Sequence, residues 1–133
     1  MHRIFPVFFQ QQRYLVKELN ETLAKHDLYH AQFTILYLLR ENGTMSLTAI
    51  WKYLDVEAPT VTRTVTRLEQ MGYVKRVEGV DKREKIIELT AFAHDKLPAI
   101  IEDVEQYERK MLRHLNDQDI AQLETILHKM KGD

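Results

Sequence analysis

The stretch PTVTRTVTRL at residues 59–68 constrains the fold more than any other part of the chain. Six of its residues are β-branched, and such side chains favour strands over helices. A strand, however, would alternate the two valines, Val61 and Val65, with Arg63 and Arg67 on one face. Burial of such a face is unfavourable, because each apolar side chain would carry a charged neighbour into the interior.

In a helix, the apolar and the polar side chains of this segment fall on opposite sides. Val61, Val65 and Leu68 then fall on one side of the helix. The other side is polar and comprises Arg63, Thr66, Arg67 and Gln70. A proline also suits the first turn of a helix. We therefore expect a helix over residues 59–71 that depends on tertiary packing, because β-branched residues cost up to about 0.7 kcal/mol each relative to alanine.

Apolar periodicity predicts further helices and one hairpin around this segment. The helices are expected at residues 4–23, 30–40 and 47–54, after Thr90, and after Asn116; the strands are expected at residues 73–77 and 84–89. Ser46, Thr90 and Asn116 suit helix N-caps. Pro98 lies inside the helix that follows Thr90, so we expect a kink or a break there. The predicted fold is mainly α with a small β-hairpin.

Length and composition narrow the possible classes of protein. A chain of 133 residues fits one domain, and its charged fraction of 29% is that of a folded, soluble protein. The absence of cysteine excludes disulfides, thiol chemistry and cysteine-bound zinc. The apolar stretch at residues 4–9 contains Pro6 and is too short for a membrane span. We expect a cytoplasmic protein with no membrane partner.

Charge is distributed unevenly along the chain, although the net charge is only -1. Residues 59–85 contain seven basic and four acidic side chains, an excess of three positive charges. Residues 1–58 are neutral, and residues 86–133 are net negative. The positive stretch therefore coincides with the predicted helix and hairpin, where it would favour contact with phosphates.

The order of helix, three-residue turn, helix and basic hairpin is typical of a winged helix-turn-helix. Residues 46–89 read SLTAIWKYLDVEAPTVTRTVTRLEQMGYVKRVEGVDKREKIIEL and resemble the MarR family of bacterial and archaeal transcriptional regulators. The resemblance implies one domain over residues 1–133, with a winged helix-turn-helix core at residues 46–90. It also implies dimerisation helices at residues 1–25 and 98–131, and a homodimer that binds an inverted repeat in double-stranded DNA, usually as a repressor.

By the same resemblance, the helix at residues 59–71 would enter the major groove. Candidate contacts are Arg63 and Arg67, with Thr60, Thr62 and Thr66 beside them. An arginine can donate two hydrogen bonds to guanine or hold a phosphate, and both uses remain open here. The threonine hydroxyls could meet phosphates or base edges, or could simply be solvated.

In the hairpin, Asp81 and Arg83 match an Asp-x-Arg element of the family, in which the aspartate orients the loop and the arginine approaches the minor groove. Lys82 would face a phosphate beside them or be solvated. Gly79 is expected to permit a tight turn. The other basic residues of the hairpin, Lys75, Arg76 and Lys85, are interpreted as phosphate-facing or solvated. The proline often found near the tip of this loop in the family is missing.

Apolar stripes at both ends of the chain favour dimerisation. They consist of Phe5, Phe8, Phe9 and Leu15 near the N-terminus, and of Ile120, Leu123, Leu127 and Met130 near the C-terminus. These residues could instead belong to the core of a single chain. A two-fold dimer would place its recognition helices roughly 34 Å apart on a palindromic operator.

The sequence leaves two other functions open. A winged-helix module that binds protein is one alternative, and a metal-responsive regulator using His26 and His30, four residues apart, is another. An enzyme is not expected, because no phosphate-binding glycine loop or nucleophile motif is present, and no cofactor is implied. A small aromatic or anionic effector is implied by the resemblance. Phe33, Tyr37 and Trp51 could border its site or belong to the core.

Overall fold

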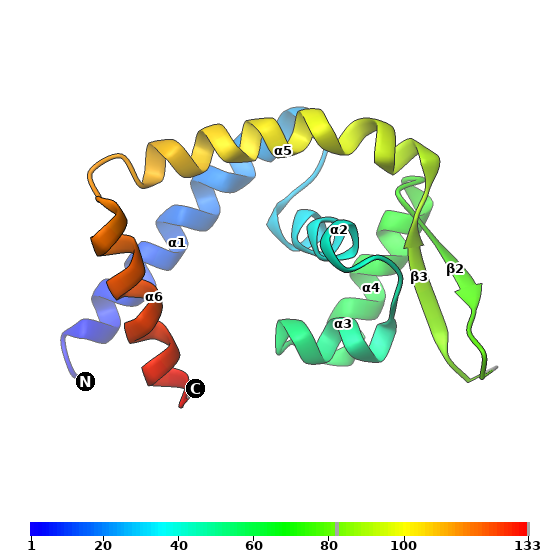
Figure 1. Cartoon of the computed structure of the whole chain (residues 1–133), viewed down its shortest axis with the longest axis horizontal. Coiled ribbons are helices and arrows are strands. Elements are labelled where there is room, and N and C mark those ends of the chain that lie inside the picture. Colours follow the sequence, from blue (N-terminus) through cyan, green and yellow to red (C-terminus); the bar gives the residue numbers. More distant parts are fainter. Residues whose placement is uncertain (82, 133) are drawn as a thin grey trace.

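Helix α5 (Ala91–Met111) runs along the whole molecule and joins its two ends (Figure 1). The computed structural model describes residues 1–81 and 83–132. One end contains α1 (Ile4–Leu23) and α6 (Asp117–Lys131), and the other contains α2 (His30–Asn42), α3 (Leu47–Leu54), α4 (Ala58–Gln70) and the sheet. A short 3-10 helix, η1 (Ala24–His26), leads from α1 toward α2. The predicted fold class, mainly helical with a hairpin, is confirmed.

The segment with strand-like composition is a helix, as its pattern predicted. The side chains of Val61, Val65 and Leu68 on α4 are at most 2% exposed, and they pack in the core with α2 and the sheet. Pro59 lies in the first turn, where its missing N–H removes no helical hydrogen bond. Packing of this one apolar side therefore outweighs the strand preference of the β-branched residues.

The sheet contains one strand more than the sequence predicted. Strands β2 (Val74–Glu78) and β3 (Lys85–Leu89) form the expected hairpin, and β1 (Met45–Ser46) adds to the free edge of β3. Met45 pairs with Ile87, and Ser46 pairs with Ile86. Two residues are too few to show a period of two, so no sequence pattern could indicate β1.

Side chains cap the helices where the sequence expected them to do so. Ser46 Oγ accepts a hydrogen bond from the N–H of Ala49 at 3.0 Å, and thus starts α3 directly after β1. Thr90 Oγ1 starts α5 in the same way, and Asn116 starts α6. A kink or a break was expected near Pro98, and the break is wrong, because α5 continues from Ala91 to Met111 with Pro98 inside it. Pro98 and His94 are both exposed, so water can reach the carbonyl that the proline leaves without a donor.

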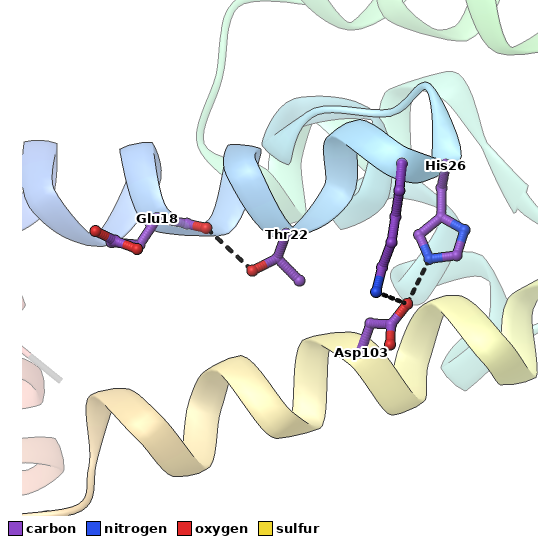
Figure 2. Close-up of polar contacts among 5 residues, drawn as sticks. Glu18, Thr22, His26 and Asp103 are labelled. Carbon is purple, nitrogen blue, oxygen red and sulfur yellow. Dashed lines mark hydrogen bonds and ion pairs between the residues drawn. The ribbon is translucent and has the colours of Figure 1, made fainter.

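Helix α1 and η1 are tied to α5 by polar contacts as well as by packing (Figure 2). His26 Nε2 lies 2.7 Å from Asp103 Oδ2, and Lys25 Nζ lies 3.1 Å from the same oxygen. Tyr107 donates its hydroxyl hydrogen to the carbonyl of Leu15 at 2.7 Å. The first two contacts fix η1 against the middle of α5, and the third fixes α1 itself to α5.

The contacts of His26 and His30 are relevant to the alternative of a metal-responsive regulator. His26 faces Asp103, and the N–H of His30 donates to Asn20 Oδ1 at 2.7 Å at the start of α2. Across residues 1–81 and 83–132, no three His, Cys, Asp or Glu side chains are grouped closely enough to hold a metal ion. Nor does this part of the chain contain a helix with the length and hydropathy needed to span a bilayer.

Candidate nucleic-acid interface

The outer side of α4 is a polar, positively charged surface. Arg63 and Arg67 are exposed there, one helical turn apart, with Thr60 and Thr62 exposed beside them. The opposite side of α4 carries the valines and the leucine that anchor it in the core. The helix is therefore held from behind and presents its basic side chains to the solvent.

The two arginines of α4 have only neutral partners. Arg63 Nη2 donates to Thr60 Oγ1 at 3.4 Å, and Arg67 Nη1 donates to Gln70 Oε1 at 3.5 Å. Within the described residues, neither guanidinium forms an ion pair with a carboxylate. Both charges thus remain available to an anion.

The threonines of α4 differ in what their hydroxyl groups do. Thr62 donates to the carbonyl of Ala58, and Thr64 donates to the carbonyl of Thr60, each at 3.0 Å. Thr66 is half-buried and instead accepts a hydrogen bond, at 2.8 Å, from Nη2 of Arg76 on β2. The hydroxyl hydrogens of Thr62 and Thr64 are therefore occupied within the helix, whereas that of Thr66 is not used in this way.

On the sequence, Arg76 was interpreted as phosphate-facing or solvated, and its contact with Thr66 of α4 was not expected. In β2 it lies on the same face of the strand as buried Val74, two residues earlier, and this face is turned toward α4. That alternation was available in the sequence, but the approach of α4 to the strand was not. The neighbouring Lys75 lies on the other face and pairs with Glu88 at 3.0 Å.

At the tip of the hairpin, Asp81 organises the backbone around Arg83. The Oδ1 of Asp81 accepts from the N–H of Arg83 at 3.0 Å, and its carbonyl accepts from the N–H of Glu84 at 2.8 Å. Arg83 is exposed. Lys82, the remaining site residue expected in the hairpin, lies outside the described residues. The turn thus presents Arg83 to the solvent on a backbone that a side-chain hydrogen bond fixes.

Gly79 was expected to permit a tight turn, but it does not use the left-handed backbone conformation that favours glycine. Its missing side chain instead leaves room for Glu84 and Ile86. Its φ is not positive, unlike those of Gly43, Gly72 and Gly132. An added Cβ would lie 3.0 Å from Glu84 Cβ and 3.1 Å from Ile86 Cγ1. A side chain at this position would therefore require Glu84 and Ile86 to move by a few tenths of an ångström.

The helix-turn-helix, its exposed arginines and the basic hairpin define a transcription regulator of the winged-helix class rather than an enzyme. A sequence model of the MarR family matches residues 28–85. The uncharacterised HTH-type transcriptional regulator YwoH of Bacillus subtilis is 44% identical over 110 residues, covering 83% of this chain and 80% of YwoH. The chain therefore belongs to the MarR family.

More distant relatives agree with this assignment. The multiple antibiotic resistance protein MarR of Escherichia coli is 30% identical, over 84% of this chain and 79% of MarR. A crystal structure of a point mutant of that protein with operator DNA superimposes with a TM-score of 0.90, at 24% identity and over 97% and 94% of the two chains. Reduced AbfR bound to DNA gives a TM-score of 0.82 at 25% identity, over 98% of this chain and 91% of AbfR.

Proposed function

We propose that this protein is a sequence-specific DNA-binding repressor that acts as a homodimer on an inverted repeat. One observation carries the proposal: Arg63 and Arg67 stand one turn apart on the exposed side of a helix whose other side is buried, and both have neutral partners only. A helix held in this way can enter the major groove without rearrangement. Its relatives support this use, because AbfR was solved bound to DNA.

The residues divide into base-reading and phosphate-holding candidates. Arg63 lies in the first half of α4, the part of a recognition helix that reaches base edges, and is our first candidate for guanine. Arg67, Thr60 and Thr62 would add contacts on either side of it. Because the hydroxyl hydrogen of Thr62 is occupied, that side chain is suited to accept from a base amino group.

The hairpin would act as the wing. Arg83 would enter the minor groove, where a narrow groove concentrates negative potential and attracts a guanidinium. Asp81 would hold the turn in the required shape through its bond to the N–H of Arg83. Lys82 would hold a phosphate nearby. Such contacts add affinity and some preference for A·T-rich flanks.

A homodimer would be built from the terminal helices. Large apolar side chains remain exposed on both in the single chain, namely Ile4, Phe5, Val7 and Phe9 on α1 and Leu123, Ile126, Leu127 and Met130 on α6. Exposed apolar side chains gathered in this way are typical of protein contacts. Both helices lie at the end of the molecule away from α4, so a pair of chains joined there would leave both α4 helices free (Figure 1).

An effector would act by shifting the spacing of the two recognition helices. A cavity of about 170 Å³ between α2 and α5 supports this part of the proposal; Phe33, Tyr37, Ile101, Val104, Glu105 and Glu108 line it. Its aromatic residues suit a small aromatic compound, whereas its two carboxylates disfavour an anion. Trp51 lines a different depression, beside the turn between α3 and α4. Repression would follow from occlusion of a promoter, in the cytoplasm and at the nucleoid.

Selection of bound duplexes from a random pool tests the proposal. We expect an inverted repeat whose binding weakens steeply with salt, and Arg63→Ala should reduce the preference for it. Arg40→Ala is the matched control, because Arg40 is an exposed arginine that already pairs with Glu41 at 3.1 Å. A protein that enriches no sequence, or an Arg63→Ala variant that enriches the same repeat equally well, would favour the protein-binding alternative.

A further inference from the structure

The hydrogen bond between Arg76 and Thr66 joins the strand of the wing to the recognition helix. Nη2 of Arg76 donates to Oγ1 of Thr66 at 2.8 Å, across ten residues of sequence. Both residues can be reached from outside, since Arg76 is exposed and Thr66 is half-buried. No ion pair to a carboxylate neutralises Arg76 in the part of the chain that the structure describes.

Both residues of this pair have hydrogen-bond donors that no group of the described residues accepts from. A guanidinium has five N–H groups, and the bond to Thr66 uses one of them. A threonine hydroxyl has one hydrogen and two acceptor sites. Because Thr66 accepts from Arg76, its own hydrogen points away from the guanidinium, and no backbone carbonyl of the described residues receives it. Thr62 and Thr64, by contrast, have already donated theirs.

A phosphodiester is the group in DNA that matches this arrangement. Its oxygens only accept hydrogen bonds, it carries a negative charge, and arginine can bind two of its oxygens at once. The pair also lies at the junction of α4 and β2, away from the first turns of the recognition helix that reach base edges. A contact to the DNA backbone fits that position better than a contact to a base.

We propose that Arg76 and Thr66 form one phosphate-binding site, in which the guanidinium and the hydroxyl donate to the same DNA phosphate and so set the depth of α4 in the groove. The inference rests on the proposed DNA binding and deepens it. Contacts of this kind position a protein on the duplex and carry no sequence information. Loss of the site should therefore weaken binding to all duplexes alike.

The test measures dissociation constants over a salt series, on the selected inverted repeat and on an unrelated duplex. Arg76→Met should weaken binding to both about tenfold and lower the salt slope by about 0.9, the value for one phosphate contact. Lys75→Met is the matched control. It removes a charge from the next residue of β2, but that charge already pairs with Glu88, so binding should match that of the parent.

Two further variants distinguish the effect of the charge of Arg76 from that of its hydrogen-bond geometry. They also keep the proposal testable if the Arg76→Met protein fails to fold. Thr66→Val keeps the shape and the charge, so it should weaken binding several-fold with the salt slope unchanged; in the Arg76→Met background its effect should be smaller, because the hydroxyl alone holds the phosphate less closely. Arg76→Lys keeps the charge but not the planar fork, so it should retain the slope and lose the coupling to Thr66. All variants should unfold at the same denaturant midpoint as the parent, to within about 0.5 kcal/mol of stability.

Neutral methylphosphonate linkages, introduced singly, locate the phosphate. One linkage should weaken the parent strongly and the Arg76→Met variant much less. The inference is overturned if Arg76→Met retains the parent's slope and affinity, or if its loss depends on the identity of one base pair. A parent protein that binds no duplex at all would overturn the proposed function as well, so the two failures are distinguishable.

Discussion

His26 and Asp103, 77 residues apart, meet at 2.7 Å and hold the segment after α1 against α5. Hydrogen bonds from His26 and Lys25 to the Asp103 carboxylate, together with their charges, lower its pKa below the ordinary value of about 3.8, against a smaller opposing effect of burial. A carboxylate with a lowered pKa stabilises the fold fully above its unfolded-state value. Its contribution is lost as the pH falls through the folded-state pKa.

We therefore expect the free energy of unfolding to fall as the pH drops below about 4, partly because of this residue. Asp103→Asn should reduce the free energy of unfolding at neutral pH. It should also make that free energy fall less steeply with pH below about 4. Denaturant titrations between pH 7 and pH 2.5 would measure both effects. Asp95→Asn, which removes an exposed carboxylate from the same helix, should leave that fall as steep as in the parent.

Leu68→Ala should destabilise the protein by about 2–5 kcal/mol, because Leu68 is completely buried behind the recognition helix. The measurement is the denaturant midpoint at constant slope. Glu69→Ala changes the exposed neighbour and should shift stability by less than about 0.5 kcal/mol. Equal effects of the two substitutions would show that α4 is not anchored by this side.

Gly79→Ala should weaken DNA binding and cost on the order of 1 kcal/mol of stability, because the new methyl would press against the side chains of Glu84 and Ile86 and require them to shift. Isothermal denaturation and binding to the selected duplex would measure both losses. Val80→Ala, at a fully exposed neighbouring position, should have no effect on either quantity. A Gly79→Ala protein as stable as the parent would mean that the hairpin adapts freely.

Asp81→Ala should lower DNA affinity several-fold by releasing the turn that presents Arg83. Asp81→Asn keeps an acceptor oxygen at the same place, so it should bind at least as well as the parent once the negative charge is gone. Fluorescence anisotropy on the selected duplex distinguishes these outcomes. If both variants lose affinity equally, the carboxylate charge matters and the hydrogen bond does not.

Phe9→Glu should convert the proposed dimer into a monomer, because Phe9 is half-exposed in the single chain and a charge there would be costly to bury at an interface. Sedimentation equilibrium measures the mass directly. Val80→Glu places the same charge on an exposed apolar position of the hairpin and should leave the mass unchanged. A dimeric Phe9→Glu protein would place the interface elsewhere.

The sequence predicted the helices, the hairpin and the basic surface because each depends on a pattern that is local in the chain. The periodic burial of Val61, Val65 and Leu68 identified α4 against the preference of its β-branched residues. The Arg76–Thr66 bond and the His26–Asp103 contact could not be predicted, since both depend on how separate elements approach one another. Proline chemistry indicated a kink or a break near Pro98, and the helix is not broken there, because the exposed side of α5 lets water approach the carbonyl that loses its donor.

Ser46 belongs to two elements at once, because its backbone pairs with Ile86 in the sheet while its side chain starts α3. The hairpin and the helix-turn-helix are consequently linked through this one residue. We expect a twist of the hairpin to be transmitted through Ser46 to α3, and from α3 to the helix α4 that packs on it. We therefore expect the hairpin, α3 and α4 to move together, so that the proposed effector would change the spacing of the two α4 helices by tilting all three elements at once.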